Sequence, residues 1–334
     1  MFFSIIIPVF NRPDEIKELL DSLLKQDFQD HFEIIIVEDG SSISSEKIID
    51  QFKNQLDISY YYKNNSGPGD SRNFGMRVAK GYYFIIFDSD CIIPLNYLSE
   101  VHKELSKNYV ECFGGKDAAL DSFSDIQKAI NFTMTSFLTT GGIRGSSEKI
   151  NKFQPRSFNM GISKKAFIAS NGFSNIHPGE DPDLSIRLWK MGYNTLLFEK
   201  AFVYHKRRIN WEKFLIQVSK FGKARPILDS WYPEYSKITF AFPTLFIISF
   251  LVSILLFLLY SFSLLFFSFL IYFLAIIIVS TLKNKSLKVG LLSFIALSIQ
   301  FYGYGTGFLV SFLKIKILKI KPEIAFPELF YTKK

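Results

Sequence analysis

Three acidic side chains stand directly after apolar segments in the N-terminal part of the sequence. Asp39 follows the run 32–37, and Asp88 and Asp90 form an Asp-Ser-Asp triplet after the run 82–87. Two carboxylates at i and i+2 of an extended chain project to the same side, so the triplet can hold a hard divalent cation such as Mg²⁺ or Mn²⁺. Such an ion would neutralise a bound diphosphate. The alternative interpretation is a polar turn after each strand, because acids are common in turns.

The segments around these acids alternate between buried strands and amphipathic helices. The run 3–10 suits a strand that is buried on both faces, and Pro13 followed by Asp14 and Glu15 marks the start of a helix. Further strands are expected at 32–37, 58–62 and 82–87, and helices at 13–24, 44–52 and 68–79. This order predicts an α/β fold with a mostly parallel sheet flanked by helices. Ligands then bind at the carboxyl ends of the strands, where the acids stand.

The C-terminal part has the composition of membrane helices. Residues 239–282 include no Asp, Glu, Lys or Arg. A transmembrane helix needs roughly 20 apolar residues, so this stretch predicts two crossings with a break near 260–263. A third charge-free stretch, 289–313, has Gly303 and Gly307 at the spacing that lets membrane helices approach closely. The alternative is that these glycines only tolerate a kink.

The positions of the lysines do not decide whether the chain crosses the membrane two or three times. Lys283, Lys285 and Lys288 suit the cytoplasm, as does the N-terminal domain, since Met1 to Ile5 shows no signal-peptide pattern. Three full crossings would export the lysines of the tail, against the positive-inside tendency. One segment that is re-entrant or interfacial would remove this conflict.

Composition argues against two other classes of protein. Only two cysteines occur, Cys91 and Cys112, which is too few for a disulfide framework. The net charge is +8, but the basic residues form no long run and gather near the apolar C-terminal segments. Membrane lipids, and no nucleic acid, are therefore the expected partners.

An amphipathic segment at 211–237 is expected between the two parts of the chain. Phe214, Val218 and Phe221 share a helical face, and neighbouring lysines can reach lipid headgroups. A plain surface helix is the alternative. The expected organisation is a domain at 1–210, this interfacial segment, and a membrane region at 238–334.

Five motifs, in this order and spacing, make the sequence similar to the family 2 glycosyltransferases with the GT-A fold. They are SIIIPVFNR (4–12), IVEDGSS (36–42), GPGDSRN (67–73), DSD (88–90) and GEDPDL (179–184). The resemblance covers roughly the first two thirds of the chain. It implies a membrane-anchored enzyme that uses a nucleotide sugar and a divalent metal, Mn²⁺ or Mg²⁺, and transfers the sugar with inversion.

The resemblance also implies roles for single residues. Asp88 and Asp90 would bind the metal, and His205 can complete its shell. The alternative for His205 is an ordinary hydrogen-bonded histidine, and for Arg72 it is a surface salt bridge. The residues implied to bind the nucleotide sugar are Pro8, Asn11, Asp39, Arg72, Asn73 and Asp88, with Pro8 and Asn11 shaping the loop and Asp39 contacting the base.

Glu180 and Asp181 are the implied catalytic acids. Asp181 would deprotonate the acceptor hydroxyl, and Glu180 would position the acceptor. Because Asp181 precedes Pro182, it also has the pattern of a helix N-cap. The two roles can coexist.

The implied reaction belongs to cell-envelope polysaccharide synthesis at the cytoplasmic face of a bacterial inner membrane. The donor would be a UDP- or GDP-sugar, and the acceptor lipid-linked or a saccharide. Residues 141–145 and 156–160 are expected to contact the acceptor, with a flexible turn as the alternative for the first segment. The alternative function is a catalytically inactive membrane scaffold that binds nucleotide sugars.

Overall fold

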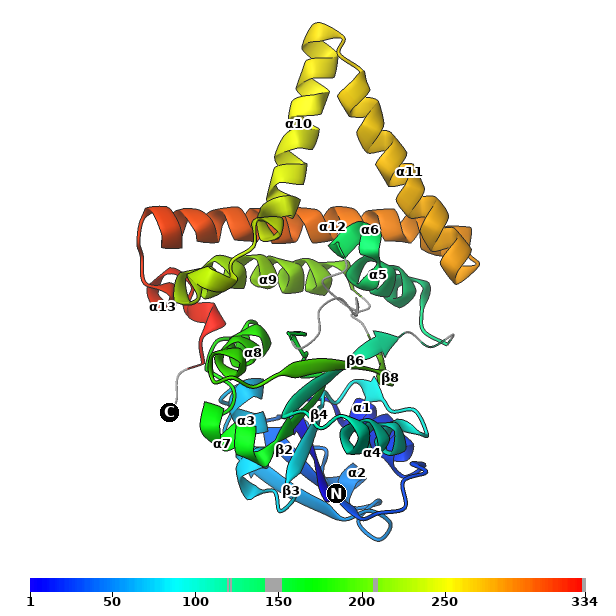
Figure 1. The fold of residues 1–334 in the computed structure, drawn as a ribbon. Helices are drawn as coiled ribbons and strands as arrows, with labels where there is room; N and C mark the ends of the chain where they lie inside the picture. The colour runs from blue at the N-terminus through cyan, green and yellow to red at the C-terminus, as the bar shows by residue number, and fades with distance from the viewer. Residues whose placement is uncertain (119, 121, 142–151, 207–209, 332–334) are drawn as a thin grey trace. The chain divides into compact units, whose positions relative to one another are not determined.

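The chain forms two compact units in the computed structural model, which describes residues 1–118, 120, 122–141, 152–206 and 210–331 (Figure 1). The first unit comprises residues 1–118, 147–206 and 330–334, and the second comprises 119–146 and 207–329. Compared with the domain expected at 1–210, the first unit lacks one internal segment and includes a short segment from beyond the apolar helices.

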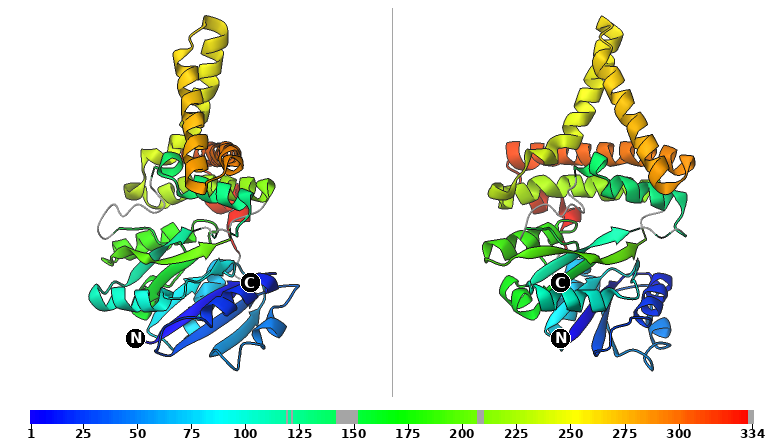
Figure 2. Two further views of the ribbon diagram at one scale, coloured as in Figure 1. Left: turned by 90° about the vertical axis from the view of Figure 1, so that its right-hand side faces the viewer. Right: turned by 45° about the vertical axis from the view of Figure 1, so that its right-hand side comes forward.

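A mixed sheet is the centre of the first unit (Figures 1 and 2). Its strand order is β3-β2-β1-β4-β7-β6-β8-β5. Neighbouring strands from β3 to β4 in this order are parallel, whereas β7 is antiparallel to both β4 and β6. The parallel arrangement expected from the sequence therefore describes the N-terminal half of the sheet. The strands are β1 (Phe3–Val9), β2 (Phe32–Asp39), β3 (Ile58–Lys63), β4 (Tyr83–Phe87), β5 (Cys91–Ile92), β6 (Cys112–Ala118), β7 (Asn159–Ser163) and β8 (Thr195–His205).

Helices cover both faces of this sheet. They are α1 (Pro13–Leu23), α2 (Glu46–Ile49), α3 (Pro68–Val78), α4 (Tyr97–Lys107), α7 (Lys164–Ser170) and α8 (Glu180–Lys190). The helix expected at 44–52 is shorter than predicted, because only 46–49 are α-helical and turns follow. The other helices and strands of this unit lie close to their expected positions.

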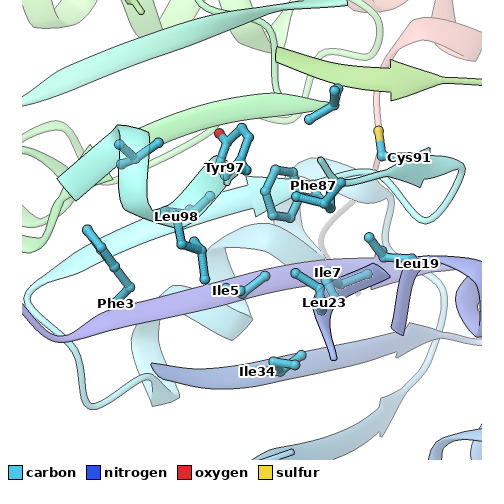
Figure 3. Close-up of a cluster of buried hydrophobic side chains, with 14 of the residues drawn as sticks. Phe3, Ile5, Ile7, Leu19, Leu23, Ile34, Phe87, Cys91, Tyr97 and Leu98 are labelled. Atoms are coloured by element: carbon cyan, nitrogen blue, oxygen red, sulfur yellow. The ribbon is translucent and has the colours of Figure 1, made fainter. Parts of the chain in front are cut away.

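Side chains of β1 alternate between two hydrophobic cores. Ile5 and Ile7 lie in the core under α1 and α4, and Figure 3 shows them beside Leu19 and Leu23 of α1. Ile6 lies in the opposite core, with residues of α3, α7 and α8. Burying each such side chain contributes roughly 1.5–3 kcal/mol. The two cores therefore hold the strand ends, and the polar side chains that follow them, in fixed positions.

The second unit consists of helices. They are α5 (Asp125–Thr135), α6 (Phe137–Thr140), α9 (Trp211–Trp231), α10 (Phe242–Tyr260), α11 (Leu264–Asn284), α12 (Leu287–Phe312) and the short α13 (Pro322–Ala325). Helices α10 and α11 form a hairpin, while α12 runs beside α9 and across the direction of the hairpin (Figures 1 and 2). Among the described residues, 238–260, 264–284 and 287–317 are long and apolar enough to cross a membrane.

Glycines allow α12 and α9 to approach closely. A Cβ atom added at Gly303 would lie 2.7 Å from Val218 Cγ2, and one added at Gly307 would lie 2.4 Å from the carbonyl oxygen of Ser219. Gly222 of α9 lies equally close to the α12 backbone. The glycine pair therefore serves close helix packing, as its spacing predicted, and α12 stays helical through both positions.

The apolar face of α9 is covered by protein. Phe214 and Val218 are buried in one cluster with Ile130 of α5 and Ala296 of α12, and Phe221 packs against it. These three side chains therefore contact protein, and the position of 211–237 at a membrane interface stays a prediction. The aromatic and basic pattern of α9 reflects a helix whose apolar side contacts other helices of the same unit.

Candidate functional site

The carboxylate of Asp39 organises the turn before α3. Asp39 ends β2 and accepts hydrogen bonds from the backbone N–H groups of Ser66 and Gly67, both at 3.0 Å. It also forms an ion pair of 2.6 Å with Lys63. Gly67 has a φ of 93°, which favours glycine. These donors engage both carboxylate oxygens, so Asp39 shapes this edge of the site, and its contact with a base stays a prediction.

Asn11 connects the loops that follow β1 and β2. Its side-chain oxygen accepts hydrogen bonds from the backbone N–H groups of Ser42 at 2.8 Å and Ile43 at 3.0 Å. Its own backbone has a φ of 54°, a left-handed conformation that asparagine tolerates. Pro8 is buried in β1 beside Val37 of β2. Both residues therefore lie at the carboxyl edge of the parallel strands.

Asp90 and His205 meet where β5 pairs with β8. Asp90 Oδ1 lies 3.2 Å from His205 Nε2, and Arg12 Nη1 donates to Asp90 Oδ2 at 2.5 Å. Burial alone would raise the pKa of Asp90, but His205 and Arg12 outweigh burial and hold that pKa well below its usual range. The Asp90 carboxylate is therefore ionised at neutral pH.

These two residues fit a divalent cation. Within the part of the chain that the structure describes, His205 Nδ1 is buried without a hydrogen-bond partner, and Asp90 Oδ1 is buried with no hydrogen-bond partner beyond its contact with His205 Nε2. Their ligand atoms and the Cys91 sulfur all lie within 4.8 Å of one another. Oxygen and imidazole nitrogen suit Mn²⁺. Asp88, which the sequence also predicts as a ligand, is outside this group, and its carboxylate pairs with Arg72.

Arg72 connects Asp88 with Glu180. From α3 its Nη2 reaches Asp88 Oδ1 at 2.7 Å, and its Nη1 reaches Glu180 Oε1 at 3.2 Å. Burial alone would lower the pKa of Arg72, but the two carboxylates raise it overall, so the guanidinium stays charged. Arg72 is 3% exposed, and the alternative of a surface salt bridge is therefore wrong.

Asn73 hydrogen-bonds the main chain of Phe173, whose ring lies next to the Arg72 guanidinium. Its amide nitrogen donates to the carbonyl oxygen of Phe173 at 2.8 Å, and its amide oxygen accepts from the N–H of Phe173 at 2.8 Å. The Phe173 ring centroid lies 5.4 Å from the Arg72 guanidinium carbon. Asn73 therefore positions the ring against which Arg72 packs.

Glu180 and Asp181 have opposite environments at the start of α8. Glu180 Oε1 accepts from Arg72 and lies 2.8 Å from His177 Nδ1. Burial would raise the pKa of Glu180, but His177 and Arg72 lower it to about 2. Burial and the neighbouring Glu180 charge raise the pKa of Asp181 to about 6, against smaller opposing effects of Arg72, Arg156 and a Ser157 hydrogen bond.

Asp181 does not cap α8, so that part of the sequence interpretation is wrong. The helix begins at Glu180, and Gly179 is the N-cap, with no side-chain cap. The Asp181 carboxylate instead accepts a hydrogen bond through Oδ2 from the N–H of Ser157 at 3.1 Å. Its Oδ1 is buried and has no hydrogen-bond partner among the described residues. One oxygen is thus held in place, and the other can accept a proton.

Two polar residues of the site were not identified from the sequence. Arg12 lies inside the first motif, but its sequence position indicates no partner, and His177 lies outside all five motifs. Only the fold shows that Arg12 reaches Asp90. The three-residue spacing from His177 to Glu180, followed by a helix start, was a weak sequence indication of their contact.

The proposed acceptor segments are only partly described. Residues 142–145 lie outside the described residues, and Gly141 ends α6 with a φ of 60°. In the second segment, Asn159 is turned into the protein, where it accepts from Tyr97 at 2.5 Å and donates to Ala201 at 2.8 Å. The charge of Arg156 reaches Asp181 and favours its ionised form. Arg156 and Ser157 are therefore the members of 156–160 that act on Asp181.

Comparison with known protein families gives one match. The family described as "Glycosyl transferase family 2" matches residues 4–169. The poly(ribitol-phosphate) beta-N-acetylglucosaminyltransferase TarS of Staphylococcus aureus is 39% identical over 103 residues, which are 30% of this chain and 18% of that protein. A GalNAc(5)-diNAcBac-PP-undecaprenol beta-1,3-glucosyltransferase of Campylobacter jejuni is 25% identical over 206 residues, 61% of this chain and 62% of that protein. The chain thus spans less than two thirds of these relatives.

Solved structures share the fold at low sequence identity. A mannosyltransferase from Pyrobaculum calidifontis, solved with GDP-Man and Mn²⁺, has a TM-score of 0.53 at 15% identity, over 67% of this chain and 62% of that chain. The structure of S. aureus TarS 1-349 in complex with UDP-GlcNAc has a TM-score of 0.51 at 17% identity, over 96% of this chain and 93% of that chain. These likenesses establish the fold alone.

Proposed function

The chain belongs to glycosyltransferase family 2 and has the GT-A fold, and from that premise we propose that it transfers a sugar from a nucleotide donor to a cell-envelope acceptor. Two relatives support the acceptor class, because one is named for poly(ribitol-phosphate) and the other for an undecaprenol-linked saccharide. Fold neighbours with UDP-GlcNAc and GDP-Man support a UDP- or GDP-sugar donor.

The donor lies between the ends of β1, β2 and β4 in this proposal. Asp90 and His205 would hold a divalent cation, which fits the burial of their ligand atoms and the unpartnered Nδ1 of His205. The cation, Mn²⁺ or Mg²⁺, supplies positive charge to the diphosphate when bound. Arg72 adds a permanent positive charge and is held in place by Asp88 and Glu180.

Asp181 is the general base. The acceptor hydroxyl oxygen attacks the anomeric carbon, the bond from that carbon to the diphosphate oxygen breaks, and the hydroxyl proton passes to Asp181 Oδ1. This single displacement inverts the anomeric configuration. A pKa of about 6 lets Asp181 be ionised at neutral pH and still accept a proton. The buried, unpartnered Oδ1 of Asp181 is the observation on which this assignment rests.

Glu180 is a positioning residue. Its charge is balanced by Arg72 and His177, and its pKa is lowered to about 2, so it is a poor proton acceptor. It orients Arg72 and raises the pKa of Asp181. This division of roles matches the order of the two acids that the family resemblance implied.

The α10–α11 hairpin anchors the enzyme in the membrane. Both helices expose most of their apolar side chains, whereas α12 is partly covered because it packs along α9. If α10 and α11 both cross the membrane and α12 lies at the interface, Lys283 and Lys285 are on the same side of the membrane as residues 1–237. The lysines after α12 would stay on that side too, which removes the conflict with the positive-inside tendency. We place that side at the cytoplasm of a bacterial inner membrane.

Turnover of nucleotide sugars tests this function. The purified full chain is incubated in detergent with a panel of UDP- and GDP-sugars, with Mn²⁺ or with a chelator. We expect slow hydrolysis of one donor, stimulated by Mn²⁺, and faster consumption when a lipid-linked saccharide is added. Nucleotide binding without turnover of any donor would support the scaffold function, and no binding would reject both.

A further inference from the structure

A short segment from beyond the apolar helices belongs to the first unit. Phe330 forms an isolated antiparallel bridge with Ile176, in the loop that precedes α8. The N–H of Tyr331 donates to the carbonyl oxygen of Asn175 at 3.0 Å. The side-chain amide nitrogen of Asn175 donates to the carbonyl oxygen of Tyr331 at 3.5 Å. Main-chain pairing thus fixes Tyr331 beside this loop.

The Tyr331 ring lies directly on Gly67. A Cβ atom added at Gly67 would come within 2.3 Å of the ring, so any side chain there would displace it. The N–H of Gly67 is one of the groups that bind the Asp39 carboxylate. The ring centroid also lies 6.1 Å from the imidazole of His177, which contacts Glu180. The ring therefore contacts the turn that binds Asp39 and lies near the start of α8.

The Tyr331 hydroxyl is affected by the charges of Asp39 and Glu180, as expected from the position of the ring. Partial burial raises its pKa, and the negative charges of Asp39 and Glu180 raise it further. The hydroxyl is therefore a neutral hydrogen-bond donor at physiological pH, and the ring is a flat apolar surface with one exposed part.

We propose that Tyr331 is part of the donor site and forms the wall against which the nucleoside of the donor packs. This inference rests on the proposed function. An aromatic ring binds a nucleobase through stacking, which tolerates different bases. A residue that follows the membrane helices in the sequence would then help to bind a ligand of the first unit.

Cysteine labelling tests the position directly. In the full chain, Tyr331→Cys introduces a thiol at the proposed wall, while the native Cys91 and Cys112 are buried. We expect saturating UDP or GDP with Mn²⁺ to slow maleimide labelling at this position by roughly tenfold. The matched control is Tyr62→Cys, at an exposed tyrosine of β3, whose labelling should not change. Equal labelling of the Tyr331→Cys variant with and without nucleotide would overturn the proposal.

Nucleotide affinity tests the role of the ring. Calorimetry on the full chain should show roughly tenfold weaker binding of UDP or GDP for Tyr331→Ala, and less than about threefold weaker binding for Tyr331→Phe, which keeps the ring. Melting temperatures should show that both variants are folded. Unchanged or tighter binding by Tyr331→Ala would overturn the proposal, and tighter binding would mean that the ring occupies the site. If the wild-type chain bound neither nucleotide, the proposed function would fail as well.

Discussion

Two adjacent carboxyl groups at the start of α8 have opposite pKa shifts because their neighbours differ. Glu180 contacts two cationic partners, and its pKa is lowered to about 2. Asp181 has one backbone donor and one unpartnered oxygen, and its pKa is raised to about 6. Pairs of acids whose pKa values are pushed apart in this way identify which group takes a proton.

The raised pKa of Asp181 predicts a pH-dependent stability difference. In the unfolded chain this group has its ordinary pKa of 3.8, so between that value and about 6 the folded state binds more protons. The folded state therefore loses stability as pH rises through this window. Since one pKa unit corresponds to about 1.4 kcal/mol, Asp181→Asn should stabilise the protein by roughly 1–3 kcal/mol at about pH 7.5 and by little at about pH 4. Thermal melting of both proteins at the two pH values measures this, and a pH-independent difference would contradict the environment assigned to Asp181.

The environment of Asp90 predicts which carboxylate the metal needs. Asp90→Asn keeps a hydrogen-bond acceptor for Arg12 but removes the negative charge that faces His205. We expect the Mn²⁺ stimulation of nucleotide binding to fall by at least roughly tenfold. Asp21→Asn, which affects only a surface pair with Lys17, is the matched control and should bind normally. Undiminished Mn²⁺ stimulation in Asp90→Asn would exclude Asp90 as a ligand.

The sequence located most of these residues but not their partners. Asp90 and His205 could be placed at strand ends because apolar runs precede them. In the structure their ligand atoms lie within 4.8 Å of each other. The cap assigned to Asp181 was wrong because a local pattern does not show that Ser157, distant in sequence, offers a donor. Tyr331 had no local indication at all, since its contacts with Gly67 and Asn175 depend entirely on the tertiary fold.

At the level of elements, the packing of α12 against α9 depends on backbone contact. Gly303 and Gly307 of α12 and Gly222 of α9 leave no room for a side chain. Gly305 lies on a different side of α12, next to Pro243 of α10. The small-residue spacing was readable from the sequence, but the partner was not, because a glycine pattern marks a contact surface without identifying the helix that covers it.

A larger side chain at Gly307 should separate these helices. A Cβ atom there would lie 2.4 Å from the carbonyl oxygen of Ser219, a backbone atom that cannot move aside cheaply. Gly307→Leu should therefore destabilise the second unit by roughly 1–3 kcal/mol or more. Ser298→Leu, at an exposed position of the same helix, is the control and should have little effect. Thermal unfolding in detergent measures both, and equal stability of the two variants would contradict the close packing.

At the level of the whole molecule, the chain combines a sheet-based unit with a helical unit that exposes apolar surface. The composition predicted this division, because charge-free stretches separate clearly from the alternating strands and helices. It did not predict that 119–146 would join the helical unit, since no apolar run of membrane length occurs there. Nor could it choose between two and three crossings, because α12 is as apolar as a spanning helix yet is covered along one side.

Thiol accessibility distinguishes two crossings from three. Ser261→Cys lies in the turn between α10 and α11, and Lys321→Cys lies after α12. With a two-helix hairpin, a membrane-impermeant maleimide should label the first from outside intact spheroplasts and the second only after lysis. The native cysteines are buried and serve as the background in unmodified protein. Labelling of Lys321→Cys in intact spheroplasts would mean that α12 crosses the membrane.

Single-turnover sugar transfer by Asp181→Asn is the most direct test of the enzyme proposed here. Asparagine can still accept the hydrogen bond from Ser157 but cannot take the acceptor proton. We predict that this variant binds the nucleotide sugar normally and transfers it at least roughly a hundredfold more slowly, while Glu180→Gln loses less. Normal transfer by Asp181→Asn, together with an inactive Glu180→Gln, would contradict the assignment of Asp181 as the base.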